Sequence, residues 1–354
     1  MPCRFDSGSW QFFKSNVEQN YKSIIIVFFE ALMFSDTHFH FSMIKNCLQN
    51  SAVNIVKQMV NQNCFFALDI GTKSEDVFSR ANEITKTISE LSENERTFAE
   101  KFFFQSAGIW PAKDAIQNRK TEIEKLKKAI VQFENQKSND KIASENFSFE
   151  KKLLDKNPNE KKSFNTNSFP KKICAIGECG CDHHWNPNGA DGRNEEDFPP
   201  EILFGENELF EMQLSLAKKM QLPIIVHSRD AFFDTLSCIK NAGYDNGIIH
   251  CFSYGIDEAK KFLERGWFLS FSGSVTYTKK SRLDDMKKLL CLVPSEQLLC
   301  ETDAPYLSPV PHRGEVNTPA NVSFVYEFVA KMRGVSVETL SKTVDENCKR
   351  LFHL

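Results

Sequence analysis

Two features on which many small metal-binding and secreted proteins depend, cysteine pairs at Cys-x-x-Cys spacing and an even number of cysteines, are missing from this 354-residue sequence. No cysteine pair has the Cys-x-x-Cys spacing, which excludes a zinc ribbon and a dithiol redox site. The eleven cysteines are odd in number, and the closest pair, Cys179 and Cys181, is separated by a single residue. Most cysteines are flanked by apolar residues, as in the run from Asn63 to Phe66. We therefore expect reduced, mostly buried thiols, as in a cytosolic protein.

Long hydrophobic runs and a strong net charge are also missing. The apolar run over 24–34 is roughly 11 residues long and contains Glu30, whereas a transmembrane helix needs about 20 residues. The sequence shows no signal peptide, and we predict a cytoplasmic protein without membrane contact. The formal charge is 44 − 47 = −3, which gives no hint of a polyanionic partner. Hydrophobic residues make up 41% and charged residues 26%, so the chain can bury a core and disorder throughout is excluded.

What the sequence does contain is a regular alternation of strand-like and helix-like segments. Apolar, β-rich runs recur eight times, and amphipathic stretches such as 206–221, 257–265 and 283–292 lie between them. This alternation is typical of parallel strands joined by crossover helices. Eight units predict an α/β fold, a (β/α)8 TIM barrel, with an open doubly wound sheet as the alternative. The predicted strands are 34–38, 64–70, 102–107, 173–177, 223–227, 247–251, 267–271 and 297–303.

Two segments do not fit the barrel pattern. Residues 1–32 contain no strand–helix unit, and we interpret them as an N-terminal extension upstream of a later natural start at Met33. Residues 119–172 form a charged, partly helical insert after the third strand, with helical spacing over 120–136 and a flexible loop predicted over 137–168. The insert carries 14 basic and 8 acidic residues, so its charge is +6 and the remainder carries −3 − 6 = −9. The basic insert either helps to attract a phosphate backbone or is a solvated loop.

Histidines and carboxylates collect where the predicted strands end, and six of them fall at the ends of five strands: His38, His40, Glu178, His227, His250 and Asp303. Each one alone could be an ordinary polar residue. In a barrel, however, the carboxyl ends of the strands meet on the rim where catalytic groups gather. Six ligands exceed the four that a single ion takes in a typical protein site and suit two divalent ions bridged by a carboxylate. Two ions about 3.5–4 Å apart activate water for phosphoryl or acyl hydrolysis.

Several longer motifs resemble the TatD family of metal-dependent deoxyribonucleases. The stretches that carry the resemblance are, in order, 36–40, 175–182, 223–231, 249–253, 271–273, 299–307, 311–314, 318–322 and 347–352. The resemblance covers residues 33–118 and 173–354, and it assigns a TatD-like hydrolase barrel to 33–354 with the insert inside it. It implies a barrel related to the amidohydrolases that binds two divalent ions, Mg, Mn or Zn.

The resemblance also implies a role for each of the six residues. Glu178 would bridge the two ions and Asp303 would activate the water, which makes these two the candidate catalytic residues. The His-x-His pair and Asp303 would complete the first ion, and His227 and His250 would complete the second. His183 and His184 could be interpreted as additional ligands, but the set of six is complete without them.

This chain departs from the family pattern after the third strand. The family usually has Gly-Ile-His-Pro-His there, whereas residues 108–112 read Gly-Ile-Trp-Pro-Ala. The loss of both cleft histidines puts substrate positioning and leaving-group chemistry in doubt. Trp110 could stack on a base or simply pack. Arg229 and Arg313 are placed to contact phosphates, with ordinary rim ion pairs as the alternative, and Asp36 is expected to orient a ligand or the strand turn.

Three functions follow from these observations. The leading hypothesis is a two-metal hydrolase of phosphodiester bonds in DNA, a deoxyribonuclease whose action could be exonucleolytic. The second keeps the metal site and changes the substrate to an ester or amide such as aminoacyl-tRNA. The third is a non-catalytic scaffold that binds nucleic acid, against which the presence of all six ligands argues. The sequence determines neither the physiological metal nor the oligomeric state, and it is compatible with a monomer.

Overall fold

The computed structural model describes residues 32–48, 51–139, 173–184 and 199–354. Residues 1–31 of the predicted extension and residues 140–172 of the predicted insert lie outside the described residues. Met33–Leu354 form one compact unit, which contains the barrel and its helices. Among the helices that the structure describes, none combines the length and the hydropathy that a membrane crossing requires.

Eight strands occur in the described part of the chain, each parallel to its neighbours, in the order β1 to β8. They are β1 (Phe34–Phe39), β2 (Cys64–Asp69), β3 (Phe103–Ala107), β4 (Ile173–Asp182), β5 (Ile224–Arg229), β6 (Gly247–Ile249), β7 (Phe268–Phe271) and β8 (Leu298–Cys300). The ring closes where Phe39 bridges in parallel to Ala304, just after β8. Asp303 N donates to His38 O at 2.8 Å across the same seam. The predicted barrel is confirmed, and the open sheet is wrong.

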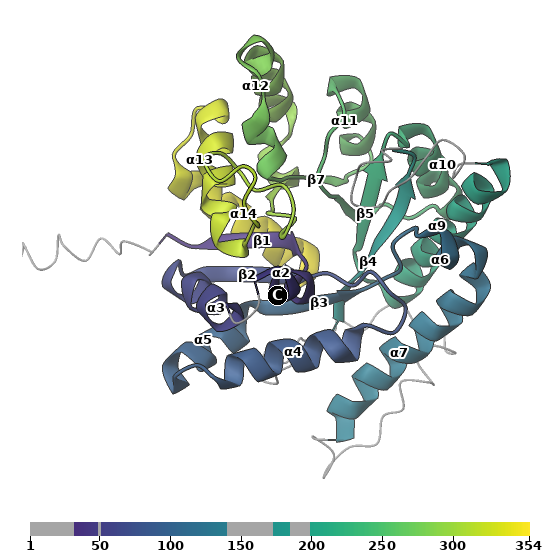
Figure 1. Ribbon diagram of the computed structural model, residues 1–354. Helices are drawn as coiled ribbons and strands as arrows, with labels where there is room; N and C mark the ends of the chain where they lie inside the picture. Colours follow the sequence, from purple (N-terminus) through teal and green to yellow (C-terminus); the bar gives the residue numbers. More distant parts are fainter. Residues whose placement is uncertain (1–31, 49–50, 140–172, 185–198) are drawn as a thin grey trace, which may run out of the picture. The chain divides into compact units, whose positions relative to one another are not determined.

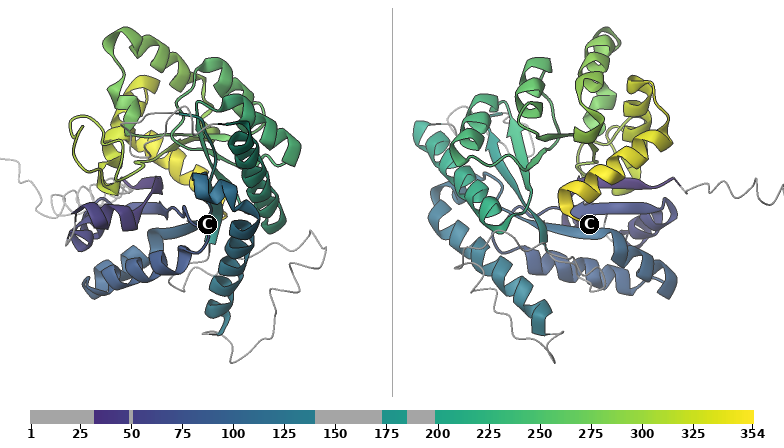
Figure 2. Two further views of the ribbon diagram at one scale, coloured as in Figure 1. Left: turned by 45° about the vertical axis from the view of Figure 1, so that its right-hand side comes forward. Right: turned by 180° about the vertical axis from the view of Figure 1, so that it is seen from behind.

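Helices surround the strands on the outside of the barrel (Figures 1 and 2). Those of the first half are α2 (Phe41–Leu48), α3 (Ala52–Asn61), α4 (Val77–Ser89), α5 (Glu93–Phe102), α6 (Lys113–Gln117) and α7 (Arg119–Asn139). Those of the second half are α9 (Pro200–Met220), α10 (Phe232–Ala242), α11 (Ile256–Leu263), α12 (Leu283–Leu292), α13 (Val322–Arg333) and α14 (Val337–Phe352). Short 3-10 turns are η2 (Gly273–Tyr277), η3 (Lys280–Arg282), η4 (Ser295–Gln297) and η5 (Pro319–Asn321).

Phenylalanine fills much of the space between the barrel and its helices. Phe103 at the start of β3 contacts Phe39, Phe41 and Phe102, with ring centroids 6.2, 6.0 and 4.8 Å away. All four rings are buried, and each contributes about 1.5–3 kcal/mol by leaving water. The cluster joins β1 and β3 to the helices α2 and α5, which holds the end of β1 in place.

The other end of β1 is held by the last two helices. The Tyr326 hydroxyl on α13 donates to Ser35 O at 3.0 Å and accepts from Ser35 N at 3.2 Å. The Ser35 hydroxyl donates to Asp345 on α14 at 2.6 Å. All three residues are buried. β1 is therefore fixed at both ends by the packing around it, and this strand carries the His-x-His pair.

The first part of the predicted insert is a packed helix. α7 coincides with the helical spacing over 120–136 and buries Ile123, Leu126, Ile130 and Phe133. It lies against α4 and α9, and Phe133 meets Phe78 with ring centroids 5.4 Å apart. α7 thus stands where the crossover helix between β3 and β4 belongs in a (β/α)8 barrel.

A β-bulge in β4 turns Glu178 into the barrel. Ile176 pairs with Ile224 and Cys179 with Val226, so β4 has one residue more than β5 between these pairs. The Ser106 hydroxyl donates to Gly177 O at 2.6 Å, and Glu178 N donates to Gly71 O at 2.7 Å. Gly177 has φ +134°, and a Cβ there would lie 2.6 Å from Ile225 O, so only glycine fits this bulge.

Three strands differ by more than one residue in length from the sequence-based expectation. The sequence predicts an end of β4 at Gly177, but the strand continues through the bulge to Asp182. β6 and β8 end earlier than expected, at Ile249 and Cys300. His250 and Asp303 therefore lie in the turns that follow their strands, and Asp303 has a positive φ of 55°.

Candidate metal centre

The structure brings all six predicted ligands together, and we call them the ligand cluster. They come from β1, β4, β5 and the turns after β1, β6 and β8, at one end of the barrel. Their ligand atoms form three groups whose members lie within 4.8 Å of one another: His38, His40 and Glu178; His38, His250 and Asp303; Glu178, His227 and His250. Glu178 and the histidines His38, His40 and His250 are buried, while 14% of the Asp303 side chain is exposed. The His227 side chain is 16% exposed, so the cluster opens to solvent beside Asp303 and His227.

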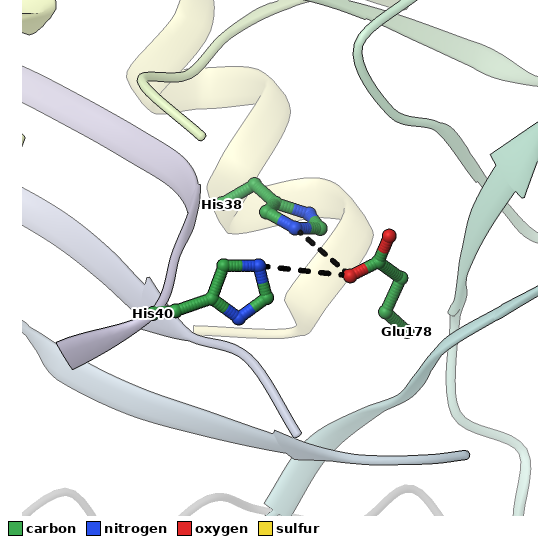
Figure 3. Close-up of side chains that lie close together, drawn as sticks. All are labelled: His38, His40 and Glu178. Atoms are coloured by element: carbon green, nitrogen blue, oxygen red, sulfur yellow. Dashed lines mark ion pairs between the residues drawn. The ribbon is translucent and has the colours of Figure 1, made fainter. Parts of the chain in front are cut away.

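The Oε2 atom of Glu178 faces the His-x-His pair (Figure 3). His38 Nε2 lies 3.4 Å from this oxygen and His40 Nε2 lies 3.7 Å from it. The same two nitrogens lie 3.7 and 3.8 Å from Asp303 Oδ1. The two imidazoles and the two carboxylates surround one position, which we call the first side of the cluster.

The Oε1 atom of Glu178 faces the other two histidines. His227 Nδ1 lies 2.9 Å and His250 Nε2 lies 3.0 Å from this oxygen. The two nitrogens are 3.1 Å from each other, so both ring edges point to one place. We call this position the second side. Glu178 thus presents one oxygen to each side, which is the arrangement that a bridging carboxylate requires.

Two buried carboxylates outside the predicted set hold the histidines of the second side. Asp182 Oδ2 lies 3.0 Å from His227 Nε2, and Glu301 Oε1 lies 3.4 Å from His250 Nδ1. Glu301 is anchored by Cys251 N, which donates to it at 2.6 Å. The sequence contains a usable signal for Glu301, which stands two residues before Asp303. No such signal marks Asp182, because it meets His227 only through the pairing of β4 with β5.

The chemistry of these residues fits divalent cations. In the described part of the chain, Nε2 of His38, which faces Glu178 and Asp303 on the first side, is buried without a hydrogen-bond partner. Buried polar atoms in folded proteins are normally paired, and an ion between this nitrogen and the two carboxylates would pair it. Imidazole nitrogens with carboxylate oxygens form a donor set that suits Zn²⁺ and Mn²⁺, and its carboxylate–water part suits Mg²⁺.

On the second side, burial and neighbouring charges shift the pKa values of the side chains in opposite directions. Burial by itself raises the pKa of Glu178, but His250, His227 and His38 outweigh it and hold that pKa well below its usual range. Burial lowers the pKa of His227, yet Asp182 and Glu178 raise it to about 9. Glu178 raises the pKa of His250 in the same way, well above its usual value. Because ligand nitrogens must be unprotonated, an ion that binds here displaces protons.

On the first side, burial sets the direction of the pKa shifts. Burial and the nearby His250 lower the pKa of His38 to about 4, and burial lowers the pKa of His40. Both imidazoles are therefore neutral at pH 7, with lone pairs available. Burial raises the pKa of Asp303 to about 7, and the charges of Glu178 and Glu301 add to this effect.

Three polar residues beside the cluster lie outside its ligand groups. Asp36 accepts from Thr302 N at 2.9 Å, from the Thr302 hydroxyl at 2.6 Å and from His38 N at 3.3 Å. It holds the turn after β8 against β1, as the expected orienting role requires. His183 pairs with Glu206 at 2.9 Å, and His184 pairs with Asp230 at 2.6 Å. Within the described residues, neither histidine belongs to a group that could hold an ion.

None of the three predicted substrate contacts belongs to a ligand group among the described residues, and Trp110 is the one with a contact to the cluster. Trp110 is half-buried, and its ring meets the His227 ring edge-on with centroids 5.9 Å apart. Arg229 is exposed at the end of β5. Arg313 is exposed, and its guanidinium carbon lies 4.5 Å from the centre of the Tyr277 ring, a cation–π contact. Of the eleven cysteines, the ten that the structure describes are free thiols, most of them buried.

Comparison with known proteins places the chain in a family. The family model described as TatD-related DNase matches residues 35–353. The chain belongs to this family. A relative from Escherichia coli K12, described as the uncharacterized metal-dependent hydrolase YcfH, is 37% identical over 184 residues, which are 51% of this chain and 63% of that protein. The uncharacterized metal-dependent hydrolase YabD of Bacillus subtilis is 36% identical over 189 residues, 53% of this chain and 68% of that protein. The first match thus spans less than two thirds of the relative's length.

Solved structures of family members share the fold. The crystal structure of the TatD homologue YjjV from Escherichia coli has a TM-score of 0.60 at 20% identity and covers 91% of this chain and 98% of its own. A TatD-family hydrolase from Entamoeba histolytica has a TM-score of 0.62 at 16% identity, covering 90% and 98% of the two chains. At these identities the likeness extends to the barrel alone.

Proposed function

We propose that this protein is a metal-dependent hydrolase that cleaves phosphodiester bonds of DNA. The observation that carries the proposal is that the two carboxylate oxygens of Glu178 each face a separate pair of histidines, at 2.9–3.7 Å. The description of the family as DNase and the metal-dependent hydrolases among the relatives support it. His38, His40 and Asp303 would hold one divalent ion and His227 and His250 the other, with Glu178 shared.

The residues of the chain have distinct tasks in this reaction. When bound, two divalent ions lower the pKa of a water and offset the charge of the phosphoryl oxygens. Asp303, on the solvent side of the cluster, accepts the proton that the attacking water loses. As the new phosphorus–oxygen bond forms and the bond to the leaving oxygen breaks, Asp303 returns this proton to the leaving oxygen. Glu178, which faces both sides of the cluster, holds the two sides in place relative to each other.

Substrate positioning is assigned to residues around the cluster. Arg229 and Arg313 would each contact a phosphate, because a guanidinium offers paired donors to phosphate oxygens. Trp110, beside His227, would stack on a base at the place where the family usually has histidines. An acidic body of formal charge −9 outside the basic insert makes such local cations necessary for binding DNA.

A nuclease assay tests the proposal. The purified chain should degrade labelled single- or double-stranded DNA with Mg²⁺, Mn²⁺ or Zn²⁺, and EDTA should stop the reaction. Asp303→Asn should lower the rate by about 10²–10⁴-fold, the usual contribution of a positioned proton acceptor. Asp257→Asn is the matched control, because that side chain is 91% exposed on α11. Equal, background-level cleavage by wild type and Asp303→Asn with every metal would sink the proposal.

The second candidate is hydrolysis of an ester or amide such as aminoacyl-tRNA by the same residues. It is favoured by one observation, the presence of Trp110 and Ala112 in place of the histidines that line the family's substrate cleft. Release of the amino acid from charged tRNA, with DNA left intact, would select this reaction. A non-catalytic scaffold would instead bind far less than one ion per chain.

A further inference from the structure

His227 makes polar contacts through both of its ring nitrogens. Nδ1 points to the second side, 2.9 Å from Glu178 Oε1 and 3.1 Å from His250 Nε2. Nε2 points the opposite way, 3.0 Å from Asp182 Oδ2. The ring therefore links the ligand cluster to a carboxylate that belongs to no group able to hold an ion among the described residues.

Asp182 is built to keep its side chain in one orientation. It is 1% exposed. Its second oxygen, Oδ1, accepts from His184 N at 3.0 Å, and its own N–H donates to Glu206 Oε1 at 3.0 Å. With Oδ1 occupied by a backbone donor, Oδ2 is the atom that faces His227. A carboxylate oxygen in this place accepts a hydrogen bond and cannot donate one.

We propose that Asp182 is a positioning residue that fixes the tautomer of His227 for ion binding. By accepting the Nε2 proton, Asp182 leaves the Nδ1 lone pair directed at the second side, where it can bind a cation. The carboxylate also makes the imidazole more basic and therefore a stronger ligand. This inference rests on the proposed function, because it assumes that the second side holds an ion.

Asparagine at this position would require His227 Nε2 to accept a hydrogen bond instead of donating one. In Asp182→Asn, the amide oxygen keeps the hydrogen bond from His184 N, which places the amide NH₂ against His227 Nε2. That nitrogen must then accept, and the proton moves to Nδ1, the atom that should bind the ion. Asp182→Ser removes the carboxylate but imposes no tautomer, because a hydroxyl can donate or accept. A purely structural role predicts the opposite order, since asparagine preserves the shape and serine leaves a gap.

The test is the stoichiometry and affinity of ion binding by the full chain. Wild type, Asp182→Asn and Asp182→Ser are stripped of metal and titrated with Zn²⁺ against a chromophoric chelator, and their folding is checked by circular dichroism. Asp345→Asn is the matched control, because it makes the same change at a carboxylate that is 3% exposed and bonded to Ser35 instead. Wild type and the control should each bind two ions.

The expected result is selective weakening of one ion. Asp182→Asn should bind the second-side ion at least tenfold more weakly, within the range of about 10–100-fold for lost ligand partners, and should keep the other ion. Asp182→Ser should lose less. Two ions at wild-type affinity in Asp182→Asn, or a larger loss in Asp182→Ser, would overturn the role of Asp182 alone. A wild-type chain that takes up fewer than two ions would overturn the proposed two-ion site together with it.

Discussion

Single residues in this protein acquire their chemistry from their neighbours. Glu178 and Asp303 are both carboxylates of one cluster, yet the histidines around Glu178 hold its pKa well below the usual range, whereas burial raises the pKa of Asp303 to about 7. Pairs of carboxylates separated in this way divide their tasks in many hydrolases. In this cluster the division leaves Glu178 ionised, as a shared ligand must be, and gives Asp303 a proton affinity close to neutral pH.

Asp345 tests the effect of burial at a residue far from the cluster. Burial raises the pKa of Asp345 from 3.8 to about 6, so the folded protein binds this proton more tightly than the unfolded chain. The associated stability is fully present below the unfolded pKa and is lost as pH rises through about 6. Asp345→Asn removes the charge and keeps an acceptor for Ser35. We expect it to raise the free energy of unfolding by on the order of 2 kcal/mol at pH 8 and by much less at pH 4.5.

Urea unfolding of both proteins at the two pH values, with a chelator present, measures this difference. Wild type and variant should converge as the pH falls, because wild-type Asp345 becomes protonated and resembles asparagine. An effect of equal size at pH 4.5 and pH 8 would show that the charge of Asp345 is not responsible.

At the scale of elements, one buried ion pair joins β2, β3 and α4. Arg80 on α4 lies 2.5 Å from Asp69 Oδ2 at the end of β2 and donates to Ser106 O on β3 at 2.6 Å. The other oxygen of Asp69 accepts from Phe41 N at 2.9 Å. Because Phe41 follows His40 directly, this network holds the turn that carries His40.

Arg80→Met should therefore be strongly destabilising. It leaves the Asp69 carboxylate, which is fully buried, without its cation, and breaking such a pair costs about 3–5 kcal/mol. Arg282→Met removes a guanidinium that is 74% exposed and lies 3.3 Å from Asp285, and exposed pairs contribute less than about 1 kcal/mol. Denaturant midpoints of the two variants measure the contrast. Similar losses in both would mean that the Asp69–Arg80 pair does not hold these elements together.

The elements also show which parts of the structure the sequence predicts and which parts it does not. Strand–helix alternation predicts the barrel correctly, and histidines at strand ends predict a cluster, because parallel strands all finish at one rim. The sequence does not predict the bulge at Gly177 and Glu178 in β4, because this bulge is stabilised by contacts with Gly71 and Ser106, which are distant in sequence. The sequence leaves Asp182 unassigned for the same reason, because only the pairing of two strands brings it to His227.

At the scale of the whole molecule, the net charge is distributed unequally along the chain. The eight strands and the whole ligand cluster lie within Met33–Leu354. Outside the insert of +6, the chain carries −9, and carboxylates are concentrated around the cluster in Glu178, Asp182, Glu301 and Asp303. Cations stabilise such a group of carboxylates, so the ions of the proposed reaction would also balance this charge.

The proposed chemistry depends above all on two divalent ions, one on either side of Glu178. Anomalous X-ray scattering from crystals grown with Mn²⁺ locates such ions without reference to any reaction. We predict two peaks about 3.5–4 Å apart, one between Glu178 and the His-x-His pair and one between Glu178, His227 and His250. A single peak, or two peaks of which one does not contact Glu178, would contradict the two-ion site.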